Sequence, residues 1–170
     1  MNAPRNPDRR QPGKKPQPQV TLRELSGGQW ELVHPPCVRR RADDLAEVRA
    51  MLAAGEIDVA VDELRWLLEG CRPLVEAHQL LGQIAFDQGD VELARSHFGM
   101  AYELGLAALA RGPPAIRLPY SRPANQPFLS AAKGLALCLA RSGDKKQAAE
   151  VVGRLLTLDP SDPLEVGGTP

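Results

Sequence analysis

Few residues of this chain have the type and spacing that catalysis or metal binding requires. His78 and His97 fall in neighbouring predicted helices, where they could approach each other, but packed or solvent-exposed histidines explain both more simply. His34 and Cys37 are spaced as half of a metal site would be, yet a structural zinc site generally takes four ligands and no second such pair follows. We therefore expect no catalytic residue, no metal and no other cofactor, and we predict that the chain is not an enzyme.

The cysteines are Cys37, Cys71 and Cys138, an odd number of widely separated residues. This pattern suits reduced thiols in a cytosol better than a disulfide framework. Cys138 lies between two leucines, where a free cysteine behaves as a small hydrophobic residue. No apolar stretch is long enough to span a bilayer, and no hydrophobic segment of a secretory signal follows the basic start. We therefore expect a cytoplasmic protein without a membrane partner.

Charge is distributed unevenly along the chain. The formal net charge is zero, but residues 1–19 hold five basic residues against one acidic residue, so they carry +4 and the remainder carries −4. This stretch has no aromatic residue and no periodic apolar pattern, which predicts a disordered tail. A basic tail could contact nucleic acid or an acidic partner, and a solvated leader is the simpler alternative.

Residues 20–33 alternate apolar and polar side chains around Ser26-Gly27-Gly28, which is typical of a β-hairpin. A lone hairpin is only marginally stable in water. We therefore expect it to pack on the first helix pair and cover its exposed end. The alternative is a segment that occupies a groove as a bound peptide would. The two prolines that follow, within residues 34–37, predict a rigid connector.

Apolar residues then recur at helical spacing in three successive pairs of segments. The clearest pair spans residues 77–104, where two amphipathic stretches meet at Gly89. Small residues such as Gly82 and Ala94 suit two antiparallel helices that approach closely. The helices are expected at about 42–54, 57–70, 74–87, 91–110, 127–142 and 145–157.

The turn glycines Gly55, Gly89 and Gly143 have similar surroundings. Each is followed by an acidic residue, by an alanine five positions later and by a large apolar residue nine positions later. The first two glycines are 34 residues apart, and the second interval of 54 residues equals that period plus an insertion of 20. The pattern resembles the tetratricopeptide repeat family, over roughly residues 41–110 and 127–162, with a degenerate first repeat.

The resemblance implies a stack of helix pairs in which the first helix of each repeat lines a concave groove. Such a groove binds an extended peptide or a helix of a partner protein. Some members of the family clamp a carboxylate with lysine and asparagine on these helices, but Leu45 and Arg49 stand at those places here, so that function is not expected. The implied partner-binding residues are Arg49, Gln79, Gln83, Phe86, Asp87, Lys133, Leu137 and Arg141.

The least regular stretch is residues 112–127, which contain five prolines and cannot be helical throughout. Long irregular loops within compact domains are often functional. Tyr120, Arg122 and Asn125 are therefore recognition candidates, on the interpretation that the stretch closes the concave groove. The alternative is a stiff connector whose apolar residues fill the gap between the second and third helix pairs.

The expected architecture is an all-α helix-pair stack (α-solenoid) with a small N-terminal β-hairpin. Its parts are a disordered tail (1–19), the hairpin and connector (20–37), the helical domain (38–160) and a disordered end (161–170). The predicted function is a non-catalytic interaction scaffold.

Two alternative functions stay open. One is association with nucleic acid through the basic tail and Arg39–Arg41, although we expect nucleic acid less than a protein partner. The other is a homodimer formed through the C-terminal helix, because Leu155, Leu156 and Leu158 have no predicted cover. The sequence does not identify the partner.

Overall fold

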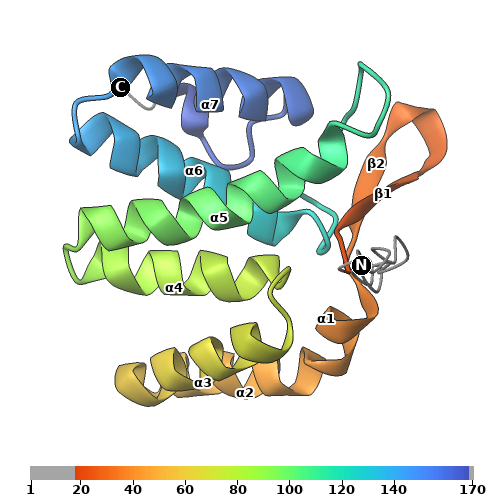
Figure 1. Ribbon diagram of the computed structural model, residues 1–170. Coiled ribbons are helices and arrows are strands. Elements are labelled where there is room, and N and C mark those ends of the chain that lie inside the picture. The colour runs from red at the N-terminus through yellow and green to blue at the C-terminus, as the bar shows by residue number, and fades with distance from the viewer. Residues whose placement is uncertain (1–17, 169–170) are drawn as a thin grey trace, which may run out of the picture.

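The computed structural model describes residues 18–168, which form seven α-helices and one antiparallel pair of strands (Figure 1). This confirms the prediction of an all-α fold with a small N-terminal hairpin. Most of the predicted basic tail, residues 1–17, lies outside the described residues. The elements are β1 (Thr21–Glu24), β2 (Trp30–Val33), α1 (Pro36–Arg40), α2 (Ala42–Ala53), α3 (Ile57–Gly70), α4 (Val75–Asp87), α5 (Val91–Leu109), α6 (Gln126–Arg141) and α7 (Lys145–Leu158).

The three helix pairs α2/α3, α4/α5 and α6/α7 share one type of turn. Gly55, Gly89 and Gly143 have φ values of 78°, 82° and 84°, in the left-handed region that glycine adopts without strain. The acidic residue that follows two of these glycines caps the next helix: Asp90 accepts a hydrogen bond from the backbone N–H of Leu93, and Asp144 does the same for Gln147. The glycine–acid sequence therefore ends one helix and begins the next.

Helices α4, α5 and α6 meet around the ring of Phe98, which is 1% exposed. A Cβ atom added at Gly82 on α4 would lie 2.6 Å from this ring, and one added at Gly134 on α6 would lie 2.5 Å from it. Only glycine at these two positions allows both helices to approach the aromatic side chain so closely. The expected close approach of the middle helix pair is thus found, and it extends to the third pair.

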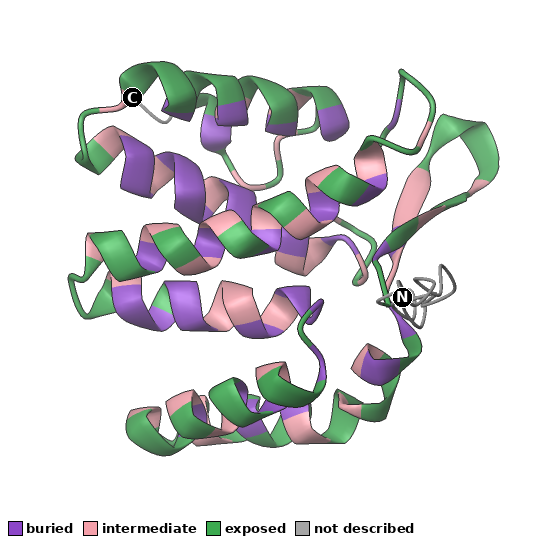
Figure 2. Cartoon of the chain, viewed as in Figure 1, coloured by how far each residue is buried: buried purple, intermediate pink, exposed green. Residues whose placement is uncertain are grey.

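The buried residues form two clusters, which appear as the inward purple faces in Figure 2. One lies among α1 to α4 and includes Leu64, Leu67 and Leu74. The other lies among α4 to α7 and includes Phe98 and Phe128. Helix α4 contributes to both clusters, so it joins the first helix pair to the rest of the molecule.

The hairpin packs in a place that the sequence did not predict. Its strands pair with Leu22 opposite Leu32, and Leu32 is buried in the second cluster rather than against the first helix pair. β1 contacts α5, and the N–H of Trp30 at the start of β2 donates to the carbonyl oxygen of Arg117 at 2.7 Å. The expected cover of the first helix pair is therefore wrong, because residues 112–125 offer the hairpin its hydrogen-bond partners.

The C-terminal segment is ordered up to residue 168, so the predicted disordered end is wrong for residues 161–168. Val166 is 2% exposed and begins a short 3-10 helix. The carboxylate of Asp162 accepts hydrogen bonds from the backbone N–H groups of Val166 and Gly167, at 2.7 and 2.9 Å. Lys133 on α6 donates to the carbonyl oxygen of Leu164 at 2.6 Å, which holds the segment against α6.

This segment also changes the expectation for α7. Leu155 and Leu158 are only 4% and 6% exposed within the single chain, and Leu156 is half-buried. Val166 and Leu164 belong to the same apolar cluster as these leucines. The uncovered apolar helix from which a homodimer was inferred is therefore not present.

Cys37 and Cys71 form a disulfide, contrary to the expectation of reduced thiols. The bond joins α1 to the residue after α3, and both cysteines are buried in the first cluster. Their proximity depends on how α1 docks, which sequence spacing does not reveal. Cys138 is free and buried, as expected, and burial raises the pKa of its thiol. Among the helices of residues 18–168, none is both long and apolar enough to cross a bilayer.

Candidate partner-binding face

The first helices of the three pairs, α2, α4 and α6, present most of the predicted binding residues. We call this surface the α2–α4–α6 face, defined by Arg49, Gln79, Gln83, Phe86, Asp87, Leu137 and Arg141. Arg49 on α2 forms an ion pair with Glu76 on α4, with the Nε atom 2.9 Å from the carboxylate. The Arg49 side chain remains 54% exposed, so the pair connects the two helices at the surface.

The same face connects α4 to α6 through an aromatic contact. The guanidinium carbon of Arg141 lies 4.1 Å from the ring centroid of Phe86, which is half-buried. This is the geometry of a cation–π contact. One turn away, the side chain of Gln83 donates to the carboxylate of Asp87 at 2.8 Å, and both residues are exposed. The structure thus brings together an aromatic ring, a planar cation and polar groups from residues about 55 positions apart in sequence.

Not every predicted residue of these helices is available. Lys133 is half-buried and its ammonium group already donates to the Leu164 carbonyl. Gln79 and Leu137 are also half-buried. The C-terminal segment therefore occupies the part of α6 around Lys133, which leaves the region around Phe86 as the more accessible part of the face.

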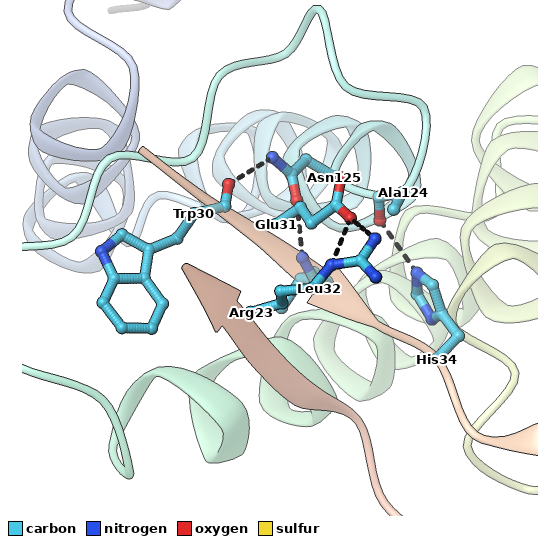
Figure 3. A network of polar contacts seen from close by, with 7 residues as sticks. All are labelled: Arg23, Trp30, Glu31, Leu32, His34, Ala124 and Asn125. Atoms are coloured by element: carbon cyan, nitrogen blue, oxygen red, sulfur yellow. Dashed lines mark hydrogen bonds and ion pairs between the residues drawn. The ribbon is translucent and has the colours of Figure 1, made fainter. Parts of the chain in front are cut away.

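Asn125 is a structural residue and not an accessible recognition residue (Figure 3). It is 0% exposed, and its side-chain oxygen accepts a hydrogen bond from the N–H of Leu32 at 2.9 Å. Its side-chain nitrogen donates to the carbonyl oxygens of Trp30 at 3.2 Å and Pro119 at 3.0 Å. The bonds to Leu32 and Trp30 attach β2 to the proline-rich stretch (residues 112–127), and the bond to Pro119 lies within that stretch. His34 adds a third attachment by donating to the Ala124 carbonyl at 2.8 Å.

Tyr120 is likewise held within the molecule. Its backbone N–H donates to the carboxylate of Asp159 at 2.7 Å, and its hydroxyl lies 3.3 Å from that of Ser130. Burial alone would raise the pKa of Asp159, but hydrogen bonds from Ser161 and the Tyr120 N–H hold it below its usual value. Arg122 is the exposed member of the three candidates.

The proline-rich stretch therefore fits the connector interpretation. Leu118 is fully buried and Ile116 is 8% exposed. The N–H of Leu118 donates to the carbonyl of Leu158, and the Arg117 side chain donates to the carbonyl of Thr157. The stretch thus links the hairpin on one side to the end of α7 on the other.

The two histidines of the middle pair do approach each other, as the sequence suggested was possible. The ring centroids of His78 and His97 are 5.9 Å apart. Burial, with a smaller contribution from His97, lowers the pKa of His78 to about 4, so this imidazole is neutral near pH 7. Burial and the nearby Arg65 lower the pKa of His97 as well. Within residues 18–168, no three potential metal ligands come together.

Sequence reasoning missed the hollows on the side of α3, α5 and α7. A hollow of about 470 Å³ lies between α5 and α7, and one of about 520 Å³ lies where Ile116 passes the ends of these helices. Two further hollows lie between the end of α3 and α5. Trp66 and Met100 on this side are 50% and 45% exposed. The sequence did contain a signal for this surface, because these two large apolar residues stand at positions that helical periodicity places outside the core.

No family model matches this chain, and no curated protein matches it in sequence. The resemblance to tetratricopeptide repeats therefore stays a prediction, which rests on the spacing of Gly55, Gly89 and Gly143 and the residues around them.

Proposed function

We propose that this chain is a non-catalytic interaction scaffold that holds a peptide or helix of a partner protein on the α2–α4–α6 face. The observation that carries the proposal is the cluster of Phe86, Arg141, Gln83 and Asp87. A half-buried aromatic ring beneath an exposed guanidinium offers an apolar contact, and the neighbouring amide and carboxylate offer hydrogen bonds. Aromatic residues and arginine are enriched at the centres of protein interfaces.

The proposal includes the tetratricopeptide character of the three helix pairs. It is supported by the equivalent turns at Gly55, Gly89 and Gly143, each with positive φ. Helices that share a repeated turn and stack side by side expose one helix of each pair on a common face, which gives an extended surface for a partner.

The cellular compartment is a separate question. The sequence favoured the cytoplasm, whereas the disulfide between Cys37 and Cys71 favours an oxidising compartment. Structural disulfides persist in oxidising compartments and are rare in the cytosol. Because all three cysteines are buried, the thiols are labelled after the source cells are quenched in acid and the protein is unfolded. Three labelled cysteines then indicate a reducing compartment.

Site-specific photo-crosslinking tests the binding face directly. A photoreactive phenylalanine analogue replaces Gln83 on the α2–α4–α6 face in one variant and the exposed Ala149 on α7 in a second, matched variant. Crosslinking in the source cell is expected to give a discrete protein adduct from position 83 and not from position 149. The adduct should weaken when Arg141→Glu is added, because the charge over Phe86 is then reversed.

The outcome that contradicts the proposal is equally specific. Adducts that form at position 149 and not at position 83 would place the partner on α7 and away from the α2–α4–α6 face. Adducts at position 83 that are unaffected by Arg141→Glu would remove the contact between Arg141 and Phe86 from the interface.

A further inference from the structure

A second surface, separate from the α2–α4–α6 face, lies between α3 and α5. We call it the α3–α5 groove. It consists of two adjoining hollows of about 310 and 380 Å³ that share Arg72 as a lining residue. Arg72, Met100, Leu104 and Arg111 are among the residues that line the first hollow, and Arg65 and Leu68 are among those that line the second.

The groove is positively charged. The hollow nearer the hairpin contains Arg72 and Arg111 and no acidic residue, and the other contains Arg65 and Arg72 against Glu69. Among residues 18–168, no carboxylate pairs with Arg72 or Arg111. Arg65 lies 3.5 Å from Asp62, but both side chains are highly exposed, so this pair is weak. Within this part of the chain, the guanidinium groups of Arg72 and Arg111 therefore have no ion-pair partner, and both residues are exposed to an anionic ligand.

Its floor is apolar. Met100 on α5 is 45% exposed, and the half-buried Leu104 lines the same hollow. The half-buried Leu68 on α3 lines the other hollow. Methionine and arginine at one site form a composition typical of protein interfaces.

We propose that the α3–α5 groove binds an acidic segment of a partner protein, with apolar side chains on the floor and carboxylates against Arg72 and Arg111. The guanidinium groups of Arg72 and Arg111 define the charge of the occupant. The exposed Met100 and the half-buried Leu104 and Leu68 define its apolar side chains. Nucleic acid fits less well, because a phosphate backbone leaves such an aliphatic floor uncovered and, among residues 18–168, no Phe, Tyr or Trp lines either hollow for base stacking.

Fluorescence anisotropy with the full chain tests this proposal. The probe is a labelled peptide of about 16 residues, composed of glutamate and leucine with the leucines on one helical face. One comparison peptide has serine in place of every leucine, and a second comparison probe is a single-stranded oligothymidylate. The protein variants are Arg72→Ala/Arg111→Ala in the groove and Lys145→Ala/Lys146→Ala on α7, which removes the same charge from exposed residues elsewhere.

The glutamate–leucine peptide should bind the wild type more tightly than either comparison probe. The groove variant should raise its Kd by about tenfold, as expected for two lost charge contacts, and the α7 variant by less than about twofold. Met100→Ser should weaken binding of the glutamate–leucine peptide without changing the dependence of Kd on salt, because it removes apolar contact area and no charge. Circular dichroism verifies that each variant is folded, and Arg111→Ala alone replaces the double variant if that one is not.

Three results would overturn the proposal. If the serine peptide bound as tightly as the glutamate–leucine peptide, charge alone would account for binding and the apolar residues of the groove would not contact the peptide. Tighter binding of the oligothymidylate, lost in the groove variant, would make this a nucleic-acid site. An equal loss of affinity in the groove and α7 variants would show that the net charge of the protein causes the binding, without a specific site.

Discussion

At the residue scale, Asn125 shows how one buried polar side chain determines where a whole element docks. Its amide has one acceptor and two donors in use, to Leu32, Trp30 and Pro119. A buried polar group is costly unless it is hydrogen-bonded, and so are the backbone groups that it serves. The sequence made Asn125 a recognition candidate because it lies in a long irregular stretch, and such stretches are often functional. Only the position of the hairpin reveals its structural role.

Replacing Asn125 by alanine should therefore lower the free energy of unfolding by about 2–4 kcal/mol, since one buried N–H and two part-buried carbonyl oxygens lose their partner. Urea denaturation measures the change. The matched control is Gln126→Ala, which removes one hydrogen bond to the Tyr120 carbonyl at 3.1 Å from a half-buried side chain and should cost under about 1 kcal/mol. Equal effects of the two changes would show that the Asn125 network does not hold the hairpin.

His78 predicts a pH dependence of stability at the same scale. Its pKa is lowered from 6.5 to about 4, mainly by burial. The unfolded chain therefore binds this proton at a higher pH than the folded chain does, so stability falls as the pH decreases from 6.5 towards 4. The lowered pKa of His97 acts in the same direction. The loss due to His78 should be about 2–3 kcal/mol across this window.

An NMR titration of the His78 imidazole measures this directly, and urea denaturation at several pH values shows its effect on stability. The His78→Gln variant should lose a large part of the decrease in stability between pH 6.5 and 4. A midpoint for the His78 imidazole near 6.5 in the folded protein would contradict the prediction, because the group would then be as accessible as in the unfolded chain.

At the scale of the elements, the positions of the helices could be predicted from sequence, but the elements that pack against one another could not. Helical periodicity and the turn glycines located α2 to α7 to within a few residues, because both signals are local. The docking of the hairpin on α5, the return of residues 161–168 over α6 and the contact of Cys37 with Cys71 all depend on residues distant in sequence. Of the predicted binding residues, those on α2, α4 and α6 share a face, whereas Asn125 and Tyr120 serve internal contacts.

The approach of α4 and α6 to Phe98 gives an element-scale prediction. Gly134→Ala should destabilise the protein by about 1–3 kcal/mol, because its Cβ atom would lie 2.5 Å from the Phe98 ring and force the helices apart. Gly99 on α5 is the matched control, since nothing lies within 4 Å of a Cβ atom added there. Gly99→Ala should raise stability by up to about 1 kcal/mol through helix propensity.

Thermal or urea denaturation of the two variants provides the measurement. Opposite signs are the expected result. If Gly134→Ala were also stabilising, the packing of α4, α5 and α6 around Phe98 could not be as close as described, and propensity alone would explain both variants.

At the scale of the whole molecule, the first and second apolar clusters are joined mainly through α4, and the disulfide lies entirely within the first. Cys37 and Cys71 are 34 positions apart and enclose α1, α2 and α3. Closing a loop of this length lowers the entropy of the unfolded chain, which stabilises the fold by about 3–4 kcal/mol on the loop-entropy model. The first cluster is the smaller of the two, so it should depend on the bond more than the second does.

Reduction should therefore loosen the first helix pair before the rest of the molecule. Hydrogen exchange measured with and without dithiothreitol is expected to show lost protection in α2 and α3, while α5 and α6 around Phe98 remain protected. Cys37→Ala/Cys71→Ala should resemble the reduced wild type and should not respond to dithiothreitol. Uniform loss of protection in all helices would contradict the division into two clusters. An unchanged pattern, together with three free thiols in the unreduced protein, would mean that the bond does not form and would restore the expectation of a reducing compartment.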